Sequence, residues 1–246
     1  MRLLSHIQRL WKAVDIERIP FVLNHSLCPI CGEYNPKGTG GICESCVFQL
    51  NYTYSWLLPV TCRNLTLFEH IFPLCYYSDG LLRSSIFQMK YHAQFPIATA
   101  YGRLLGTFLQ ERGFVSRFDA VVPVPLHWRR TLWRGYNQTA FFAAGLADCL
   151  ALPVVDALRR THKGRSQTKT KSRKNNIRGA FQLTEGAGRL LAGRHLLLVD
   201  DVLTTGATCL ECADALLTIP DVRLSFASIA IRRSLLEKKE NWKSEQ

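Results

Sequence analysis

The stretch LLLVDDVLTTGATCLECADAL, residues 196–216, is the most informative part of the sequence about the fold. Its first four residues form a run that is too short and too uniformly apolar for a surface element, which indicates a buried parallel strand. Two carboxylates, Asp200 and Asp201, come next, followed by a loop of small and hydroxyl-bearing residues, 204–208. Apolar residues at helical spacing from about Ala207 then predict an amphipathic helix. The unit is a strand, an acidic pair, a tight polar loop and a helix.

This unit has the chemistry of a site for a sugar phosphate. The first turn of a helix presents unpaired backbone N–H groups and the positive end of the helix dipole, and both attract phosphate. Gly206 lets the backbone approach a ligand closely because it has no Cβ. Asp200 and Asp201 cannot bind phosphate directly, but they can accept hydrogen bonds from vicinal sugar hydroxyls. A ribose 5-phosphate would satisfy both halves of the unit.

Two other interpretations of the stretch are less favourable. In the first it is a buried strand with an ordinary capped turn, but two adjacent aspartates at the end of such a strand are costly unless something uses them. In the second it is the acidic strand of a nucleoside triphosphatase. That requires a G-x-x-x-x-G-K-[ST] loop, which this sequence lacks.

Four cysteines near the N-terminus predict a structural zinc site. They form two Cys-x-x-Cys pairs, Cys28 with Cys31 and Cys43 with Cys46, separated by eleven residues. Two such pairs can supply four thiolates to one tetrahedral Zn²⁺, and the metal would provide folding energy to a segment without its own core. The alternatives are four unpaired thiols or a redox pair, although a redox role needs only one pair.

Composition narrows the class of protein. The chain has 246 residues, 47% of them hydrophobic, which suits one ordinary domain and a small module. No apolar run reaches the roughly 18 residues of a membrane span, and the N-terminal segment resembles an amphipathic helix (residues 3–14) rather than a signal peptide, so a cytoplasmic protein is expected. The net charge of +12 suggests a polyanionic ligand.

A second strand, loop and helix precede the first unit. Residues 118–122 predict a buried strand, residues 138–150 predict a helix, and the loop between them contains the basic residues Arg129, Arg130 and Arg134. The repeated pattern predicts a parallel α/β sheet, whose ligand lies at the carboxyl ends of the strands. We therefore expect the loops 123–138 and 200–208 to share one edge.

A short strand near Val154 to Leu158 is predicted after that helix, and it leads into the most basic segment of the chain. Nine lysines and arginines, and no acid, lie between Arg159 and Arg178. Like charges repel, so the segment should be mobile without a ligand.

Residues 199–208, VDDVLTTGAT, resemble the phosphoribosyl pyrophosphate (PRPP) binding motif of type I phosphoribosyltransferases. The chain as a whole resembles the ComF family of bacterial competence proteins. The features that carry the likeness are the four-cysteine module, the Lys90-Tyr91 helix end, the Val-Pro-Val-Pro loop, the RGYNQ sequence from Arg134, the Gln167-Thr168 and 173–176 segment, and the PRPP motif. One departure is Tyr136, where phenylalanine is common.

The resemblance implies a type I phosphoribosyltransferase fold, a parallel sheet flanked by helices, with a small N-terminal zinc-ribbon-like module. The implied division is residues 1–70 for the N-terminal helix and module, 71–235 for the phosphoribosyltransferase-like domain and 236–246 for a charged tail. It also implies a role in the uptake or processing of single-stranded transforming DNA in natural competence.

The resemblance also implies roles for individual residues. Asp200 and Asp201 would hold ribose, with Mg²⁺ accompanying PRPP, and Arg129 and Arg130 would stabilise pyrophosphate, although they also suit a solvated surface. The remaining PRPP-binding candidates are Val202, Leu203, Thr204, Thr205, Gly206, Ala207 and Thr208. The candidates for the pyrophosphate loop and the flexible closing loop are Pro125, Leu126, Arg129, Arg130, Lys163, Arg165 and Lys169.

Two functional hypotheses remain open at the level of the sequence. The first is a Mg²⁺-dependent phosphoribosyltransferase acting on PRPP. The second is a catalytically inactive nucleic-acid-binding or regulatory protein that keeps the PRPP fold. The nucleic-acid candidates are Lys90, Arg134, Lys163, Lys169, Lys171, Arg173 and Lys174, and the aromatic residues Tyr91, Trp128, Trp133 and Tyr136 could stack bases. Lys90 also suits a helix C-terminal cation, and His127 suits a packed or solvated loop residue. The sequence does not specify the acceptor, which related enzymes recognise with a variable hood; the resemblance implies that the cysteine module and residues 76–92 form this hood here.

Overall fold

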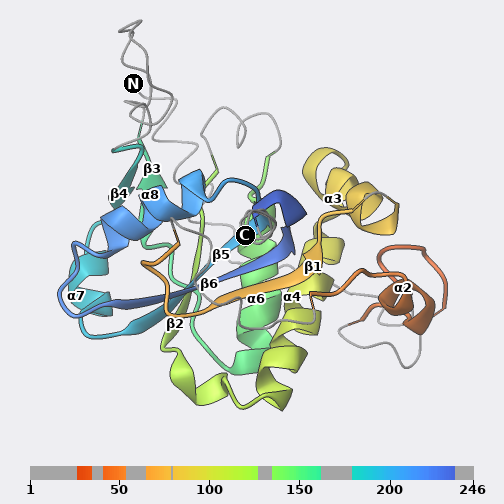
Figure 1. The fold of residues 1–246 in the computed structure, drawn as a ribbon, viewed down its shortest axis with the longest axis horizontal. Helices are drawn as coiled ribbons and strands as arrows, with labels where there is room; N and C mark the ends of the chain where they lie inside the picture. Colours follow the sequence, from red (N-terminus) through yellow and green to blue (C-terminus); the bar gives the residue numbers. More distant parts are fainter. Residues whose placement is uncertain are drawn as a thin grey trace, which may run out of the picture.

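A four-stranded parallel sheet with the strand order β1-β6-β5-β2 lies at the centre of the molecule (Figure 1). The computed structural model describes residues 27–34, 41–53, 65–78, 80–126, 135–161 and 179–235. The predicted N-terminal helix, the loop 127–134, most of the basic segment (162–178) and the tail 236–246 lie outside these residues. The parallel sheet agrees with the pattern of apolar runs separated by helices.

Strands and helices alternate along much of the chain, and the predicted strands at 118–122 and from 196 and the predicted helices at 138–150 and from about 207 are all present. The strands are β1 (Ile71–Tyr76), β2 (Ala120–Pro123), β3 (Leu158–Arg160), β4 (Phe181–Leu183), β5 (His195–Leu203) and β6 (Arg223–Ile231). The α-helices are α2 (Glu44–Phe48), α3 (Leu81–Tyr91), α4 (Phe95–Glu111), α6 (Gln138–Leu150), α7 (Ala187–Leu191) and α8 (Ala207–Leu216). Two 3-10 turns, η2 (Val115–Arg117) and η3 (Arg233–Leu235), complete the described elements.

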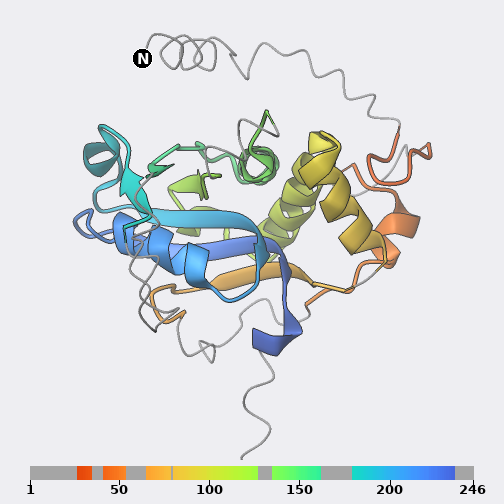
Figure 2. The ribbon, with the colours of Figure 1, turned by 90° about the horizontal axis from the view of Figure 1, so that it is seen from above.

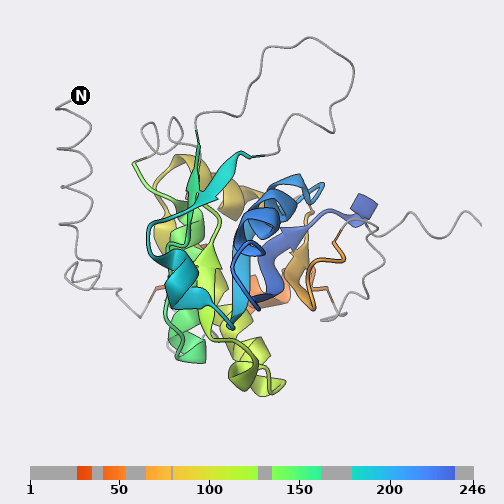
Figure 3. The same cartoon turned by 90° about the vertical axis from the view of Figure 1, so that its left-hand side faces the viewer.

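Helices cover both faces of the sheet, as the two rotated views show (Figures 2 and 3). Alternate residues of β5 point to opposite faces. Leu197 and Val199 join a core cluster with α4 and α6, whereas Leu196 and Leu198 join a second cluster with α8. This alternation explains why the run 196–199 contains no polar residue: both faces of the strand are buried.

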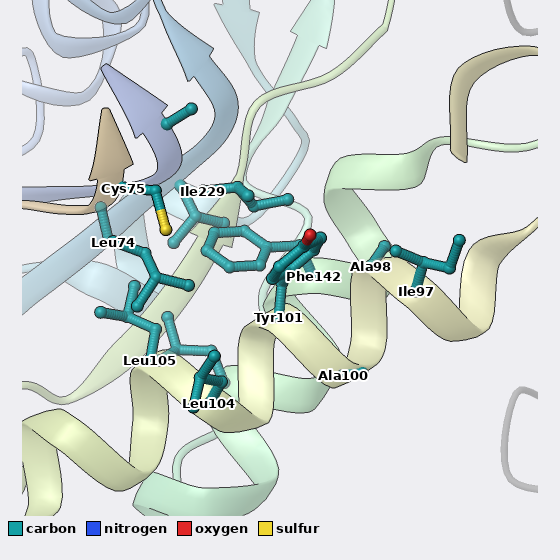
Figure 4. Packing of buried hydrophobic residues seen from close by; sticks show 14 of the residues in the cluster. Leu74, Cys75, Ile97, Ala98, Ala100, Tyr101, Leu104, Leu105, Phe142 and Ile229 are labelled. Carbon is teal, nitrogen blue, oxygen red and sulfur yellow. The ribbon is translucent and has the colours of Figure 1, made fainter. Parts of the chain in front are cut away.

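Helices α4 and α6 pack closely against each other and against the sheet (Figure 4). The close approach depends on glycine. A Cβ added at Gly145 would lie 2.1 Å from the carbonyl oxygen of Thr99, and one added at Gly102 would lie 2.2 Å from that of Phe142. Tyr101 fills the space beside this contact and is fully buried. This packing holds the N-terminal end of α6 at the edge of the sheet.

The order of the connections creates a crevice between β2 and β5. From β2 the chain passes through α6 to Val154, which forms a parallel bridge with Val121 of β2. From β5 it passes through α8 to β6, on the other side of β5. Connections that leave neighbouring strands in opposite directions open a crevice at the carboxyl ends of those strands, where ligands of α/β proteins bind.

The structure differs from the sequence-based boundaries in two strands that matter for the site. The predicted strand at 154–158 is replaced by β3 at Leu158–Arg160, which pairs antiparallel with β4, while Val154 makes only the isolated bridge. Strand β5 does not end before the acidic pair but continues to Leu203, because β6 pairs with it as far as Ile231. The two aspartates are therefore part of an ordered ladder.

Candidate functional site

A pocket of about 450 Å³ opens at the carboxyl ends of β2 and β5. It brings together residues from separate parts of the chain: Lys90, Tyr91, Val124, Pro125, Leu126, Gln138, Thr139, Arg160, Asp200, Asp201, Val202, Thr204 and Thr208. The loop after β2 and the acidic pair of β5 thus meet at one edge, as the sequence predicts. The pocket is largely polar and contains charges of both signs.

Asp201 is fixed in this pocket by two donors from different helices. The Nζ atom of Lys90, near the C-terminus of α3, lies 2.9 Å from Oδ2 of Asp201. The Nε2 atom of Gln138, the first residue of α6, donates to the same oxygen at 2.8 Å. Gln138 is held there because the side chain of the preceding Asn137 caps the helix by accepting from the backbone N–H of Thr139. The carboxylate is therefore oriented before any ligand arrives.

Asp200 lies in a different electrostatic environment. Its Oδ1 accepts a hydrogen bond from the backbone N–H of Asp201 at 2.8 Å. The pKa of Asp200 is raised to about 7, mainly by burial and then by the neighbouring charge of Asp201, while the backbone N–H of Asp201 and the cations Lys90 and Arg160 act in the opposite direction. A carboxyl with a raised pKa between a like charge and two cations is typical of a functional site, since its energy changes strongly when a ligand binds.

Arg160 is the second cation of the pocket. It ends strand β3, and its guanidinium lies over the ring of Phe181 in β4, 5.2 Å from the ring centroid. The β3–β4 hairpin thus carries a positive charge to the pocket from the side opposite α3. Lys90 and Arg160 together give the pocket two cations beside the acidic pair.

The loop after β5 leads into the N-terminus of α8. Gly206 is the N-cap of α8, with a φ of +79°, and it is buried. Thr204 and Thr208 line the pocket on either side of it, and Thr205 accepts a 3.4 Å hydrogen bond from the backbone N–H of Ala207. The loop therefore presents hydroxyl groups beside a helix N-terminus, the arrangement that suits a phosphate.

The four cysteines of the N-terminal module form a cluster. Their sulfur atoms all lie within 4.8 Å of one another, with Sγ of Cys31 and Sγ of Cys43 3.6 Å apart. The backbone N–H of Cys46 points at Sγ of Cys43, at 3.4 Å. Sulfur atoms about 2.3 Å from a tetrahedral Zn²⁺ are about 3.8 Å apart, so the set fits one ion. The cluster could hold a metal, as the paired spacing indicates.

Known proteins resemble both halves of the chain. Residues 138–245 match the family described as phosphoribosyl transferase domain. The "DNA utilization protein YhgH" of Escherichia coli K12 is 30% identical over 209 residues, which cover 81% of this chain and 88% of that protein. The chain belongs to the ComF family. "Competence protein F" of Haemophilus influenzae is 31% identical over 52% of this chain and 58% of its own length. "Competence protein ComFC" of Bacillus subtilis is 26% identical over 78% of this chain and 71% of its own length.

The family assignment agrees with the predicted type I phosphoribosyltransferase fold. Among solved structures, an adenine phosphoribosyltransferase has a TM-score of 0.40 and 15% identity, over 61% of this chain and 76% of its own. Within the described residues of this ComF protein, no helix has the length and apolar content needed to cross a membrane.

The structure places only part of the predicted site residues of this ComF chain. Pro125 and Leu126 line the pocket, as do Asp200, Asp201 and three residues of the PRPP motif. The other four predicted residues of the motif do not line the pocket, but they form the junction between β5 and α8; they are Leu203, Thr205, Gly206 and Ala207. The predicted basic residues Arg129, Arg130, Arg134, Lys163, Arg165, Lys169, Lys171, Arg173 and Lys174 lie outside the described residues, as do His127, Trp128 and Trp133.

Three features of the site were not assigned from the sequence of this ComF protein. The sequence pattern does not identify Gln138 or Arg160 as site residues, and it indicates Lys90 only as a nucleic-acid contact or a helix-end cation, although Lys90 pairs with Asp201. Tyr136, a candidate base-stacking residue, is half-buried and packs against Phe95, with ring centroids 5.9 Å apart, and its hydroxyl donates to the carbonyl of Met89.

The cysteine module contributes no described residue to the pocket, so the expected hood is represented here by α3 alone.

Proposed function

We propose that this ComF protein binds PRPP with Mg²⁺ at the pocket between β2 and β5 and acts as a phosphoribosyltransferase. One observation carries the proposal: the pocket joins an oriented acidic pair, two cations and a helix N-terminus flanked by threonines. PRPP has a ribose, a 5-phosphate and a pyrophosphate, and these need respectively hydroxyl acceptors, backbone donors and positive charge. The pocket offers each of the three.

Different residues of the pocket bind different parts of PRPP. Asp200 and Asp201 accept hydrogen bonds from the 2′ and 3′ hydroxyls of ribose. Thr204, Thr208 and the first backbone N–H groups of α8 bind the 5-phosphate. Lys90 and Arg160 neutralise pyrophosphate as it leaves, when negative charge accumulates on it.

The acidic pair also suits Mg²⁺ that arrives with PRPP. Mg²⁺ prefers oxygen ligands, is commonly bound through one or two carboxylates together with substrate phosphates, and keeps several waters. Asp200 and Asp201 provide such carboxylates at the mouth of the phosphate loop. When bound, Mg²⁺ supplies charge stabilisation to the phosphates. For the cysteine cluster we propose Zn²⁺ in a structural role, because all four ligand positions are taken by protein thiolates.

We further propose that the protein acts in the uptake or processing of single-stranded DNA. Two observations support this. The relatives are named for competence and DNA utilization, and the chain has a net charge of +12. A cationic protein gains affinity for nucleic acid by displacing counterions from the phosphates.

Isothermal titration calorimetry with PRPP and Mg²⁺ tests the proposed site. We expect saturable binding by the wild type and at least a tenfold loss of affinity in the Asp200→Asn/Asp201→Asn variant, which keeps the side-chain size but removes both charges. Leu190→Ala, a substitution at an exposed position of α7, is the control and should bind as the wild type does. Absence of binding by folded, zinc-loaded wild type would refute the proposal. Release of pyrophosphate in the presence of candidate acceptors then tests catalysis.

A further inference from the structure

A second pocket, of about 600 Å³, adjoins the first along the outer face of α3. Lys90 and Tyr91 line both pockets, so the two form one continuous surface. The described residues that line the second pocket include Arg83 but no acidic side chain. We call this second pocket the α3 groove.

The side chains of α3 separate sharply into a buried face and an exposed face. Leu82, Ile86 and Met89 are at most 3% exposed and anchor the helix in the core. Ser85 is also buried, and its hydroxyl lies 2.7 Å from that of Tyr101. The helix is therefore a fixed support, and the residues on its other face are held in place.

Two aromatic side chains are exposed on that other face. Phe87 is 53% exposed and Tyr91 is 48% exposed, and both line the α3 groove. They are four residues apart, on one face of the helix. Their ring centroids are 4.8 Å apart, and the ring of His92 lies 5.4 Å from that of Phe87. These rings are exposed to solvent beside the positive charge of Arg83 and next to the first pocket. They could therefore stack on a planar ligand that carries negative charge.

We propose that the α3 groove binds single-stranded nucleic acid, with a base stacked on Phe87 and Tyr91 and the phosphates drawn by the positive charge of Arg83. Aromatic rings beside basic groups are the usual means of holding single strands, because every base has a face that can stack. This role rests on the proposed function, because Tyr91 and Lys90 line both pockets and would place the stacked strand next to PRPP bound in the first.

A protein partner is the weaker occupant for this groove. The aliphatic residue of the groove, Ile86, is only 3% exposed, so a docked hydrophobic side chain would find little apolar surface beyond the two rings. The charge of the described lining is positive, and the chain as a whole carries +12. Both favour a polyanion with flat bases.

Fluorescence anisotropy with two labelled strands of equal length tests the proposal on the full-length, zinc-loaded protein. One strand is oligodeoxythymidylate and the other has the same phosphates but abasic sugars, so the two differ only in their bases. We expect the wild type to bind the thymidylate strand about 5- to 100-fold more tightly. Phe87→Ala should reduce this preference, and Phe87→Trp should retain it, because tryptophan restores a stacking surface.

Phe48→Ala is the matched control, since Phe48 is 91% exposed on α2 and lines neither pocket. It should leave the preference unchanged. Equal binding of the two strands by the wild type, or an unchanged preference in Phe87→Ala, would overturn the proposal. Phe87 lies outside the PRPP pocket, so PRPP titration of Phe87→Ala separates the two claims. If the protein prefers the thymidylate strand through Phe87 but does not bind PRPP, the groove proposal holds and the PRPP site is refuted. If it binds PRPP but shows no preference for bases, the PRPP site holds and the groove proposal is refuted.

Discussion

At the scale of single residues, the acidic pair shows how two adjacent aspartates acquire different properties. Asp201 receives Lys90 and Gln138 on one carboxylate oxygen, whereas Asp200 receives one backbone N–H and faces its neighbour's charge. The Lys90 ammonium thus stabilises the charged carboxylate of Asp201 directly, whereas the surroundings of Asp200 destabilise its charged form. The unfavourable environment of Asp200 is a cost in the free protein that bound cations would remove.

This difference predicts how stability depends on pH. The pKa of Asp200 is about 7 in the folded protein, above its ordinary value, so the folded state binds more protons than the unfolded state between about pH 4 and pH 7. The contribution of Asp200 to the free energy of unfolding therefore falls as pH rises through that window. We expect Asp200→Asn to be more stable than the wild type at pH 8 by about 1–3 kcal/mol, since one pKa unit corresponds to about 1.4 kcal/mol.

Urea unfolding of both proteins from pH 5 to pH 8 measures this difference. It should grow with pH and be small at pH 5, where Asp200 of the wild type is largely protonated. Asp201→Asn is the comparison, because it leaves Lys90 without its carboxylate and should destabilise the fold. A difference between Asp200→Asn and the wild type that does not change with pH would contradict the prediction.

At the scale of elements, the junction of β5 and α8 depends on a left-handed residue. Gly206 has a φ of +79°, and a Cβ there would lie 2.9 Å from Cδ2 of Leu65. A residue with a Cβ costs about 1–2 kcal/mol in this conformation. The glycine thus sets the entry of the chain into α8 and the position of the phosphate loop.

Gly206→Ala should therefore lower the free energy of unfolding by about 1–2 kcal/mol and weaken PRPP binding, because the loop must shift to relieve the strain. The matched control is Gly188→Ala in α7, where an added Cβ meets nothing within 4 Å and the φ is not left-handed. That variant should be as stable as the wild type or more so. Denaturant unfolding and calorimetry measure the two effects, and equal stability of the two variants would argue against a strained Gly206.

At the scale of the whole molecule, the cysteine module and the sheet domain share one core. Cys28, Cys43 and Cys46 are buried in the same cluster as residues of α3, α4 and β5. In Figure 1 the module's helix α2 lies at the right, below α3 and away from the β5–α8 junction. Metal at the cluster would therefore support the packing of α3, the helix that carries Lys90 and the exposed aromatic residues Phe87 and Tyr91.

Removal of the metal should consequently destabilise the whole protein rather than the module alone. We expect a zinc chelator, or Cys46→Ala, to lower the melting temperature of the main unfolding transition and to reduce the zinc content measured by mass spectrometry. Cys149→Ala changes a half-buried cysteine outside the cluster and should keep the zinc content of the wild type. Loss of zinc with no change in the main transition would show that the module and the sheet domain are energetically independent.

Local sequence patterns were sufficient to predict the individual structural units of this protein. The apolar run, the acidic pair and the polar loop predicted the strand, the helix beginning at Ala207 and the shared edge of the two loops, because strand burial and helix entry are local properties. The paired spacing likewise predicted a cysteine cluster with the geometry of a metal site. The family resemblance fixed the fold class.

The distant side chains that complete the site are identified by the packing of separate elements, not by local sequence. Lys90, Gln138 and Arg160 lie 111, 63 and 41 residues before Asp201 in the sequence. They meet the acidic pair because α3, α6 and the β3–β4 hairpin all pack around the end of β5. The exposure of Phe87 and Tyr91 depends in the same way on which face of α3 the core covers. The sequence pattern identifies residues that neighbour one another along the chain, whereas contacts between separate elements arise only when the packed core fixes their relative positions.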